Sequence, residues 1–364
     1  MAQFVCTICG QTAPLETRAC QCSCGGLFRL DFTPPRFSLD LVDQRQFNIF
    51  RYRAFMPLDN EYWREVTLGE GVTDTVEMDP GVYVKLDYAM PTLSFKDRGA
   101  AMLAWLCKSI GVQRVLQDSS GNAGNAVAAY CARAGIACEV YVPRGTSPKK
   151  IKAIEAHGAK VVVVDGTRDE TADACRARVA RDGVYYANHV YNPLFYQGTK
   201  TYLYEVFEQF GRIPDNVFIP VGNGTLLLGC QLALKELLDS GCIPRLPKLF
   251  IVQSERCAPL YGALNVGTSI RDVVPEQTLA EGIAIGRPMR GSEILGAGYD
   301  GEREVILAPE AGILPAQTAL AQKGFFVEHT SAATYAAYLE YLHNNALHGD
   351  VLIPLCGAGL KSEK

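Results

Sequence analysis

The chain has 364 residues, enough to bury a substantial core and to form more than one domain. It is 48% hydrophobic and 20% charged with a net charge of −4, and its basic and acidic residues are interspersed, which gives no electrostatic case for nucleic acid. The N-terminus lacks a signal-peptide pattern and no apolar run approaches the roughly 20 residues that span a bilayer, so no membrane partner is expected. The 13 cysteines are odd in number and scattered, which predicts reduced thiols in a cytoplasmic protein.

The first thirty residues carry closely spaced cysteines, a pattern typical of a zinc ribbon. Cys6 and Cys9 form one pair, and Cys20, Cys22 and Cys24 follow after a short spacer. A tetrahedral metal site takes four ligands, so one of these five cysteines is not a ligand. We favour Cys6, Cys9, Cys22 and Cys24, because two glycines follow Cys24 and a tight knuckle needs small residues. Residues 1–32 are therefore predicted to be a zinc-ribbon-like segment with a structural metal; a ribbon that has lost its metal, or free surface thiols, is the alternative.

Regular alternation of strands and helices begins at Val82, after an irregular aromatic-rich region with one expected helix. Strands are expected at Val82–Leu86, Arg114–Gln117, Glu139–Val142, Val161–Val164, Val217–Pro220, Leu249–Val252 and Leu352–Leu355. Helices are expected at Phe95–Ile110, Asn122–Ala134, Pro148–His157, Thr171–Arg181, Gly198–Phe210 and Thr225–Asp239. This order predicts βαβ units around a buried, mostly parallel sheet, in two α/β lobes with the ligand site at the strand ends that face a cleft.

Lys96 lies where an extended segment turns into an amphipathic helix with Ala100, Leu103 and Leu106 on its inward face. A partly buried amine at this place is disfavoured in its charged form, which makes it a better nucleophile toward an aldehyde. An ordinary solvated lysine is the alternative.

Two turns after expected strands are candidates for binding anions through free N–H groups at a helix start. Ser119–Gly124 suits a carboxylate, with the Ser119 and Ser120 hydroxyls assisting and Asn122 reaching an adjacent oxygen; an ordinary serine N-cap is the alternative. Gly222–Thr225 suits a phosphate, because its glycines allow close approach to the backbone. A lysine and two such turns suit pyridoxal phosphate (PLP), held on Lys96 as a Schiff base and carrying an amino acid substrate.

Five segments, taken in chain order, resemble the fold-type II PLP enzymes, whose closest branch is threonine synthase and its relatives: Pro91–Gly99, Ser119–Gly124, Gly222–Thr225, Glu328–Ala333 and Cys356–Lys361. The N-terminal cysteine ribbon also recurs in that branch. The resemblance implies a two-lobed α/β fold similar to that of the tryptophan synthase β chain. Residues 33–95 and 195–364 would form the large PLP-binding domain, and residues 96–194 the smaller domain that covers the active-site cleft. A homodimer is expected from the family alone.

The resemblance also implies a role for each matching residue. Lys96 would carry the cofactor, and Asn122 would hydrogen-bond its 3-oxygen. The cofactor phosphate would be held by Gly222, Asn223, Gly224 and Thr225, and the substrate carboxylate by Ser119, Ser120, Gly121, Asn122 and Ala123. Cys356 stands where the family usually has Thr or Ser facing the pyridine nitrogen. A neutral partner there limits the electron sink, which favours elimination and replacement over transamination.

The expected reaction is that of a PLP-dependent lyase acting on an amino acid with a β- or γ-leaving group, most simply O-phosphohomoserine to threonine plus phosphate. Threonine synthases typically carry an arginine where Phe195 stands, and this arginine helps to bind the substrate phosphate. An aromatic ring cannot replace a bidentate charged donor. A paralogue therefore stays open: a cysteate-synthase-like enzyme, or a threonine or serine dehydratase or ammonia-lyase. An alternative of another class is a non-catalytic ligand-binding protein on this scaffold.

Overall fold

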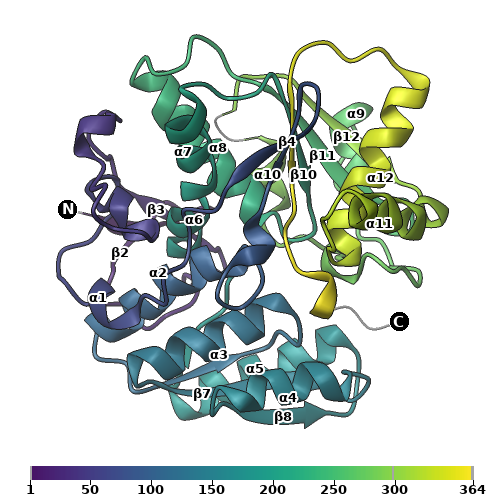
Figure 1. Cartoon of the computed structure of the whole chain (residues 1–364). Coiled ribbons are helices and arrows are strands. Elements are labelled where there is room, and N and C mark those ends of the chain that lie inside the picture. The colour runs from purple at the N-terminus through teal and green to yellow at the C-terminus, as the bar shows by residue number, and fades with distance from the viewer. Residues whose placement is uncertain (1, 297–298, 362–364) are drawn as a thin grey trace. The chain divides into compact units, whose positions relative to one another are not determined.

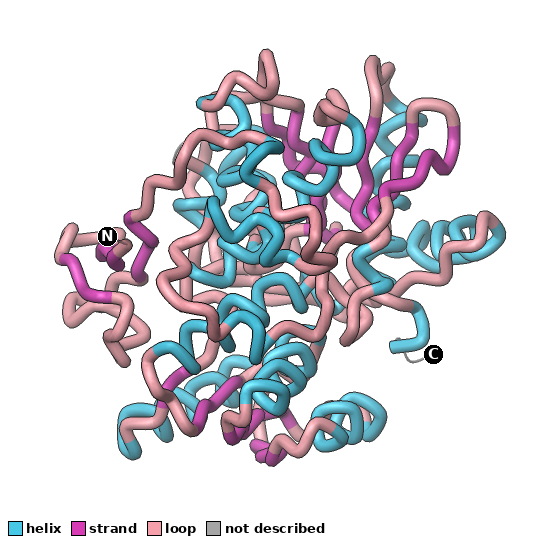
Figure 2. Tube along the Cα trace, turned by 60° about the vertical axis from the view of Figure 1, so that its left-hand side comes forward, coloured by secondary structure: helices cyan, strands magenta, loops and turns pink. Residues whose placement is uncertain are grey.

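The computed structural model describes residues 2–296 and 299–361, and the chain divides into two compact units (Figure 1). Unit 1 comprises Met1–Pro35, Asp40–Gly71 and Lys96–Gly198, and unit 2 comprises Arg36–Leu39, Val72–Phe95 and Thr199–Lys364. Helices and strands alternate along most of the chain, whereas the N-terminal segment consists mainly of loops with short strands (Figure 2). The prediction of an α/β fold is therefore confirmed.

Unit 1 contains a four-stranded parallel sheet with the order β8-β7-β6-β9. Its strands are β6 (Arg114–Gln117), β7 (Ala137–Pro143), β8 (Lys160–Val164) and β9 (Tyr185–Tyr186). Its helices are α1 (Trp63–Val66), α2 (Lys96–Ser109), α3 (Asn122–Ala134), α4 (Pro148–Ala156) and α5 (Arg168–Asp182), with α6 (Leu194–Thr199) at its end. The N-terminal strands β1 (Gln3–Cys6), β2 (Thr12–Pro14) and β3 (Phe28–Asp31) form a separate antiparallel sheet.

Unit 2 is built on a six-stranded sheet with the order β12-β11-β10-β13-β5-β4. Its strands are β4 (Thr75–Asp79), β5 (Val82–Lys85), β10 (Asn216–Pro220), β11 (Lys248–Ser254), β12 (Arg303–Ala308) and β13 (Val351–Pro354). Its helices are α7 (Thr201–Phe210), α8 (Thr225–Asp239), α9 (Tyr261–Asn265), α10 (Gly291–Leu295), α11 (Ile313–Gln322) and α12 (His329–Asn344). Within this six-stranded sheet, as far as its residues are described, only the edge strand β4 runs antiparallel to its neighbour. The four residues of β13 are all buried, as expected for a parallel sheet covered on both faces.

Local sequence signals set several helix ends. The side chain of Ser147 accepts a hydrogen bond from the Lys150 N–H at the start of α4, where Pro148 occupies the first turn. Thr167 and Glu170 form a capping box at the start of α5. Gly135 adopts a left-handed conformation with φ 72° and ends α3. These signals explain why the helices expected in this part of the chain are found.

Three details differ from the expectations. Helix α2 is not amphipathic, because every residue from Asp97 to Cys107 is buried, including the charged Asp97 and Arg98. Strand β8 lies at a sheet edge, so Val163 is 46% exposed although the strand is apolar. The helix expected at Gly198–Phe210 is two elements, α6 and α7.

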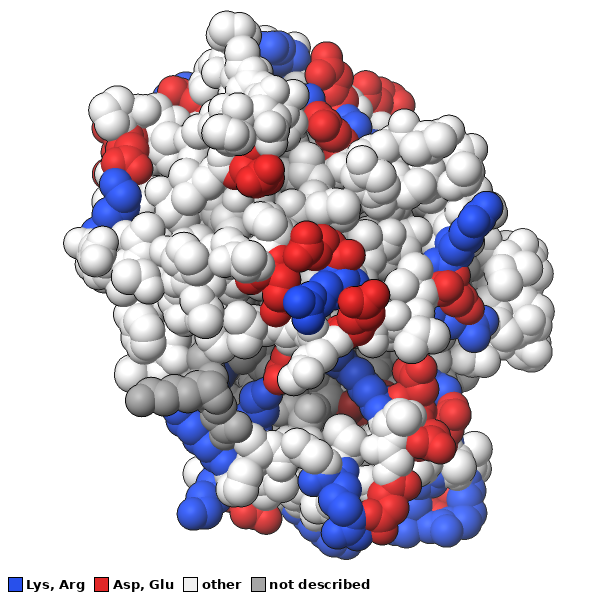
Figure 3. Space-filling model, turned by 90° about the vertical axis from the view of Figure 1, so that its right-hand side faces the viewer, with Lys and Arg blue, Asp and Glu red and all other residues white. Residues whose placement is uncertain are grey.

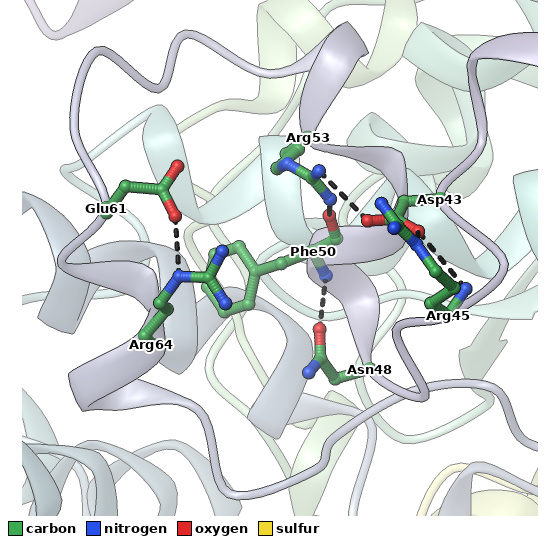
Figure 4. A network of polar contacts seen from close by, with 7 residues as sticks. All are labelled: Asp43, Arg45, Asn48, Phe50, Arg53, Glu61 and Arg64. Atoms are coloured by element: carbon green, nitrogen blue, oxygen red, sulfur yellow. Dashed lines mark hydrogen bonds and ion pairs between the residues drawn. The ribbon is translucent and has the colours of Figure 1, made fainter.

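The irregular region before β4 is held together by polar contacts of its own (Figure 4). The Asn48 side chain accepts a hydrogen bond from the Phe50 N–H at 2.9 Å. The Asp43 carboxylate binds both Arg45 and Arg53, at 3.1 and 3.0 Å, and Arg45 leads the contacts that lower the Asp43 pKa. The Asn48 contact caps a 3-10 helix, Ile49–Phe55, and the later helix α1 packs against α2.

Among the residues described, no helix has the length and apolarity needed to cross a membrane. On the face drawn in Figure 3, Lys and Arg side chains stand beside Asp and Glu side chains. This mixture agrees with the net charge of −4.

Candidate active site and cysteine cluster

Lys96 is the first residue of α2 and is half-buried. Its Nζ lies 5.7 Å from the ring centre of Phe195, a residue of α6 that is completely buried. Gly99 lies one turn after Lys96 on the same side of α2, and the Phe195 ring covers it so closely that an added Cβ would overlap the ring. A glycine at this place therefore lets an aromatic ring lie directly beside the amine.

His189 completes the group of residues around Phe195. The two rings meet edge to face, with centres 5.8 Å apart and an interplanar angle of 62°. His189 is 7% exposed, and burial, followed by the positive charges of Lys96 and Arg168, lowers the pKa of His189 well below its ordinary value. The imidazole is therefore neutral at neutral pH. The sequence analysis did not select His189, because nothing in its local sequence marks it.

The turn Ser119–Ala123 joins β6 to α3 and also belongs to unit 1. Gly121 is the N-cap of α3, and no described side chain caps this helix start, so the serine N-cap suggested as an alternative is not what the structure contains. An added Cβ on Gly124 would overlap the carbonyl oxygen of Ser119, which shows how tightly this turn folds against its helix. The first N–H groups of α3 thus carry a partial positive charge that a carboxylate can use.

The second turn, Gly222–Thr225, joins β10 to α8 in unit 2. Gly224 is the N-cap of α8 with φ 73°, and its helix start likewise has no side-chain cap among the described residues. A Cβ on Gly222 would lie 2.8 Å from Ile285 Cγ1, and one on Gly224 would lie 2.5 Å from Ile294 Cδ1. Glycine therefore avoids close contacts at both positions, and at Gly224 it also suits the positive φ.

Cys356 follows β13 and is buried in unit 2. Strands β10 and β13 are parallel with Val217 paired to Leu352, so the same register places Cys356 beside Val221, the residue before Gly222. The Cys356 N–H donates a 2.8 Å hydrogen bond to Ser331 Oγ of α12. Within unit 2 the structure thus brings Cys356 and the Gly222 turn to adjacent strand ends. It adds the hydroxyl of Ser331, which lies in the segment Glu328–Ala333.

The four cysteines favoured as metal ligands come together in unit 1. The Sγ atoms of Cys6, Cys9, Cys22 and Cys24 all lie within 4.8 Å of one another. Cys6 and Cys24 are 3.4 Å apart, and Cys9 and Cys22 are 3.6 Å apart. Four thiolates around zinc at about 2.3 Å would be separated by nearly the same distance, about 3.8 Å. The spacing and the donor set therefore fit a tetrahedral metal.

The surroundings of the cluster support the same arrangement. Hydrogen bonds from the backbone N–H groups of Cys9 and Ile8 outweigh burial and lower the pKa of the Cys6 thiol to about 6. Gly25 has φ 87°, and a Cβ on Gly26 would lie 2.5 Å from Cys6 Sγ, so both glycines are needed beside the thiols. Cys20, the fifth cysteine, instead packs against the apolar core of unit 1.

Comparison with known proteins agrees with these features. Residues 66–357 match the family described as pyridoxal-phosphate dependent enzyme. The threonine synthase of Methanocaldococcus jannaschii is 31% identical over 98% of this chain and 92% of its own. The threonine synthase of Mycobacterium leprae is also 31% identical, over 86% of this chain and 88% of its own.

Solved structures share the fold. A bacterial threonine deaminase, from T.th., has a TM-score of 0.63 at 27% identity and covers 76% of this chain and 87% of its own. Maize serine racemase has a TM-score of 0.68 at 19% identity, with 79% and 88% covered, and supports the fold alone. The chain therefore belongs to the pyridoxal-phosphate dependent enzyme family, and within that family it is similar to the threonine synthases.

Proposed function

We propose that the protein is a carbon–oxygen lyase that converts O-phosphohomoserine to threonine and phosphate with PLP as its cofactor. The similarity to threonine synthases along nearly the whole chain supports this reaction. The observation that carries the proposal is the half-buried Lys96 at the start of α2, in the motif Ser94–Gly99 of the family.

The residues present fit PLP, because the glycine-containing turn Gly222–Thr225 leads into the start of α8, whose N-cap, Gly224, has no side chain to cap it. In this proposal Gly222, Asn223, Gly224 and Thr225 bind the cofactor phosphate, and Asn122 hydrogen-bonds the cofactor 3-oxygen. Cys356 would be the residue beside the pyridine nitrogen, in the place where the family usually has Thr or Ser. Bound PLP supplies an electron sink for the α-carbon of an amino acid.

Protein groups would then hold the substrate and move its protons. The backbone N–H groups of Ser119–Ala123 at the start of α3 bind the substrate carboxylate. Lys96 would accept and return protons at the substrate carbons. The Phe195 ring beside its amine excludes water from that side of Lys96.

A second candidate reaction is favoured by Phe195 itself. This buried ring offers no charge to a substrate phosphate, so an uncharged leaving group suits it better. Elimination of water from threonine or serine is then the reaction, whereas sulfite addition to phosphoserine, the other paralogous reaction, would again need a charged donor for the leaving phosphate. The threonine deaminase that shares the fold at 27% identity supports the elimination.

Three parallel incubations separate the candidates: O-phosphohomoserine, phosphoserine with sulfite, and threonine. We expect threonine and phosphate in the first tube. Formation of a keto acid in the third tube alone would instead establish the elimination. Activity in none of them would overturn the proposed function.

A cofactor test addresses the remaining class, a non-catalytic ligand-binding protein. We expect borohydride to fix PLP on Lys96 of the wild type, and Lys96→Ala to lose both the label and the visible absorbance. Lys150→Ala, on the half-buried first turn of α4, is the matched control and keeps both. An unlabelled Lys96 in a colourless, PLP-supplied protein would contradict the proposal.

The cysteine cluster is proposed to hold one structural zinc ion in a ribbon formed by residues 1–32. Four thiolates close the coordination shell, so the metal has no open position for substrate. All 13 cysteines are free of disulfides, which supports a reducing compartment such as the cytoplasm. A homodimer remains an expectation from the family.

A further inference from the structure

His189 lies at a strand end, beside the turn assigned to the substrate carboxylate. Strands β6 and β9 are parallel, with Leu116 paired to Tyr186. If this register is continued by three residues, Ser119 stands opposite His189. The two residues follow neighbouring strands, and neighbouring strands in a sheet lie about 4.8 Å apart. Side chains extend this pairing past the last ladder residues, because Asn188 Nδ2 donates to Asp118 Oδ1 at 2.6 Å. The carboxylate turn and His189 are thus fixed to each other.

His189 and the reactive amine of Lys96 both lie beside the ring of Phe195. Its imidazole meets Phe195 edge to face at 5.8 Å, and the Lys96 Nζ lies 5.7 Å from the centre of the same Phe195 ring. A bound amino acid has its amine at the cofactor on Lys96 and its carboxylate at the Ser119 turn. Its β-carbon must lie near the groups that border both places, and His189 is such a group.

The Nδ1 atom of His189 is buried and has no hydrogen-bond partner within residues 2–296 and 299–361. A buried polar atom without a partner costs free energy, so native proteins rarely leave one unless a ligand or water supplies the bond. In the neutral ring one nitrogen donates and the other accepts. Nδ1 can therefore form one uncharged hydrogen bond to an incoming molecule.

We propose that His189 Nδ1 hydrogen-bonds the β-hydroxyl of the amino acid that occupies this site, which makes His189 a specificity-determining residue. The inference rests on the proposed function, in which threonine is either the product formed or the substrate consumed. Both reactions place an oxygen on the β-carbon. A single neutral donor or acceptor suits a hydroxyl, whereas a phosphate dianion requires charged donors that neither His189 nor Phe195 supplies.

The test compares threonine with 2-aminobutyrate, which has the same shape but lacks the hydroxyl. Each is titrated into the PLP-loaded enzyme, and binding is read from the cofactor absorbance in a rapid-mixing experiment before turnover. We expect His189→Leu to weaken threonine binding about tenfold and 2-aminobutyrate binding less than about twofold. His157→Leu, at the C-cap of α4, is the matched control and leaves both unchanged.

Two polar variants keep the test valid if His189→Leu does not fold. The amide of Asn reaches the place of Nδ1, whereas the amide of Gln reaches the place of Nε2, so His189→Asn retains threonine affinity and His189→Gln loses it. If His189→Leu weakens the binding of threonine and of 2-aminobutyrate equally, His189 serves the carboxylate or the packing. If it weakens the binding of neither, Nδ1 binds water only. Either result overturns the inference. A wild-type spectrum that responds to no amino acid would instead refute the proposed function.

Discussion

The packing of Phe195 on Gly99 gives a sharp prediction, because it couples α6 to the helix that carries Lys96. An alanine at position 99 would place its Cβ within 2.5 Å of three atoms of a ring that is completely buried. The ring has no solvent to move into, and it lies beside the Lys96 amine. Gly99→Ala is therefore expected to displace the ring and disturb the protein around the amine.

The size of the effect follows from the overlap. Carbon atoms pack at about 3.5–4.0 Å, so the ring must move by roughly 1 Å or more. Overpacking of this kind costs about 1–3 kcal/mol, whereas alanine in a helix interior regains about 1 kcal/mol relative to glycine. In a Phe195→Ala background the overlap with the ring is gone, because alanine has no atom beyond Cβ, and only the gain remains. The coupling free energy between the two substitutions is therefore expected to be about 2 kcal/mol.

The assay is a double-mutant cycle on the free energy of urea unfolding, measured for wild type, Gly99→Ala, Phe195→Ala and the double variant. Gly145→Ala is the control, since nothing lies within 4 Å of a Cβ there. The visible spectrum of the PLP-loaded proteins reports the surroundings of Lys96 in parallel. A coupling free energy near zero would refute the argument that this glycine exists to admit the ring.

Three further predictions concern groups away from this contact. Burial raises the pKa of Glu70 from 4.5 to about 7. Between these two pH values the folded protein keeps a proton that the unfolded chain has lost. The free energy of unfolding therefore falls as pH rises from 4.5 to about 7, by about 3 kcal/mol in all. Urea unfolding between pH 4.5 and 8 should therefore show a slope that Glu70→Gln removes; an unchanged slope would assign it to other groups. Cys9→Ser should reduce zinc from one ion per chain to none by elemental analysis while PLP binding persists, and metal-free wild type would contradict the ribbon. Lys85 and Glu205 form a buried ion pair at 2.8 Å. Lys85→Met should therefore lower the free energy of unfolding by about 3–5 kcal/mol, and adding Glu205→Leu should restore much of this loss. If the second substitution restores nothing, the other contacts of Lys85 dominate.

Sequence signals sufficed where they are local. The bounds of β6, α3 and α8 agree residue for residue with the expectation, because apolar runs end at turn residues such as Gly135. Helix α12 was not expected, since its small and aromatic residues show no clean helical periodicity and eight consecutive residues, Ser331–Tyr338, are buried. The edge position of β8 depends on strand order, which no single segment contains.

The residues of the candidate site likewise fall into those marked by local sequence signals and those placed by contacts of the fold. Lys96 and the two turns stand at strand–helix junctions that the sequence makes visible. His189 was missed because its place depends on the register between β6 and β9 and on contact with Phe195. Choosing Cys22 and Cys24 over Cys20 was possible from the neighbouring glycines, whereas the packing of Cys20 against the core required the structure.

Strand β9 is only two residues long, yet the loop after it is anchored by the side-chain amide of Asn188 and by the Gln117 amide, which donates to the Ala187 carbonyl at 2.8 Å. The frame is thus fixed by residues other than His189 and Phe195, the two side chains that we propose lie beside the amino acid. Exchanges at positions 189 and 195 can accumulate without rebuilding the sheet. Because these two positions are separate from the contacts that hold the loop, they are the two to randomise together in a selection for activity on other amino acids.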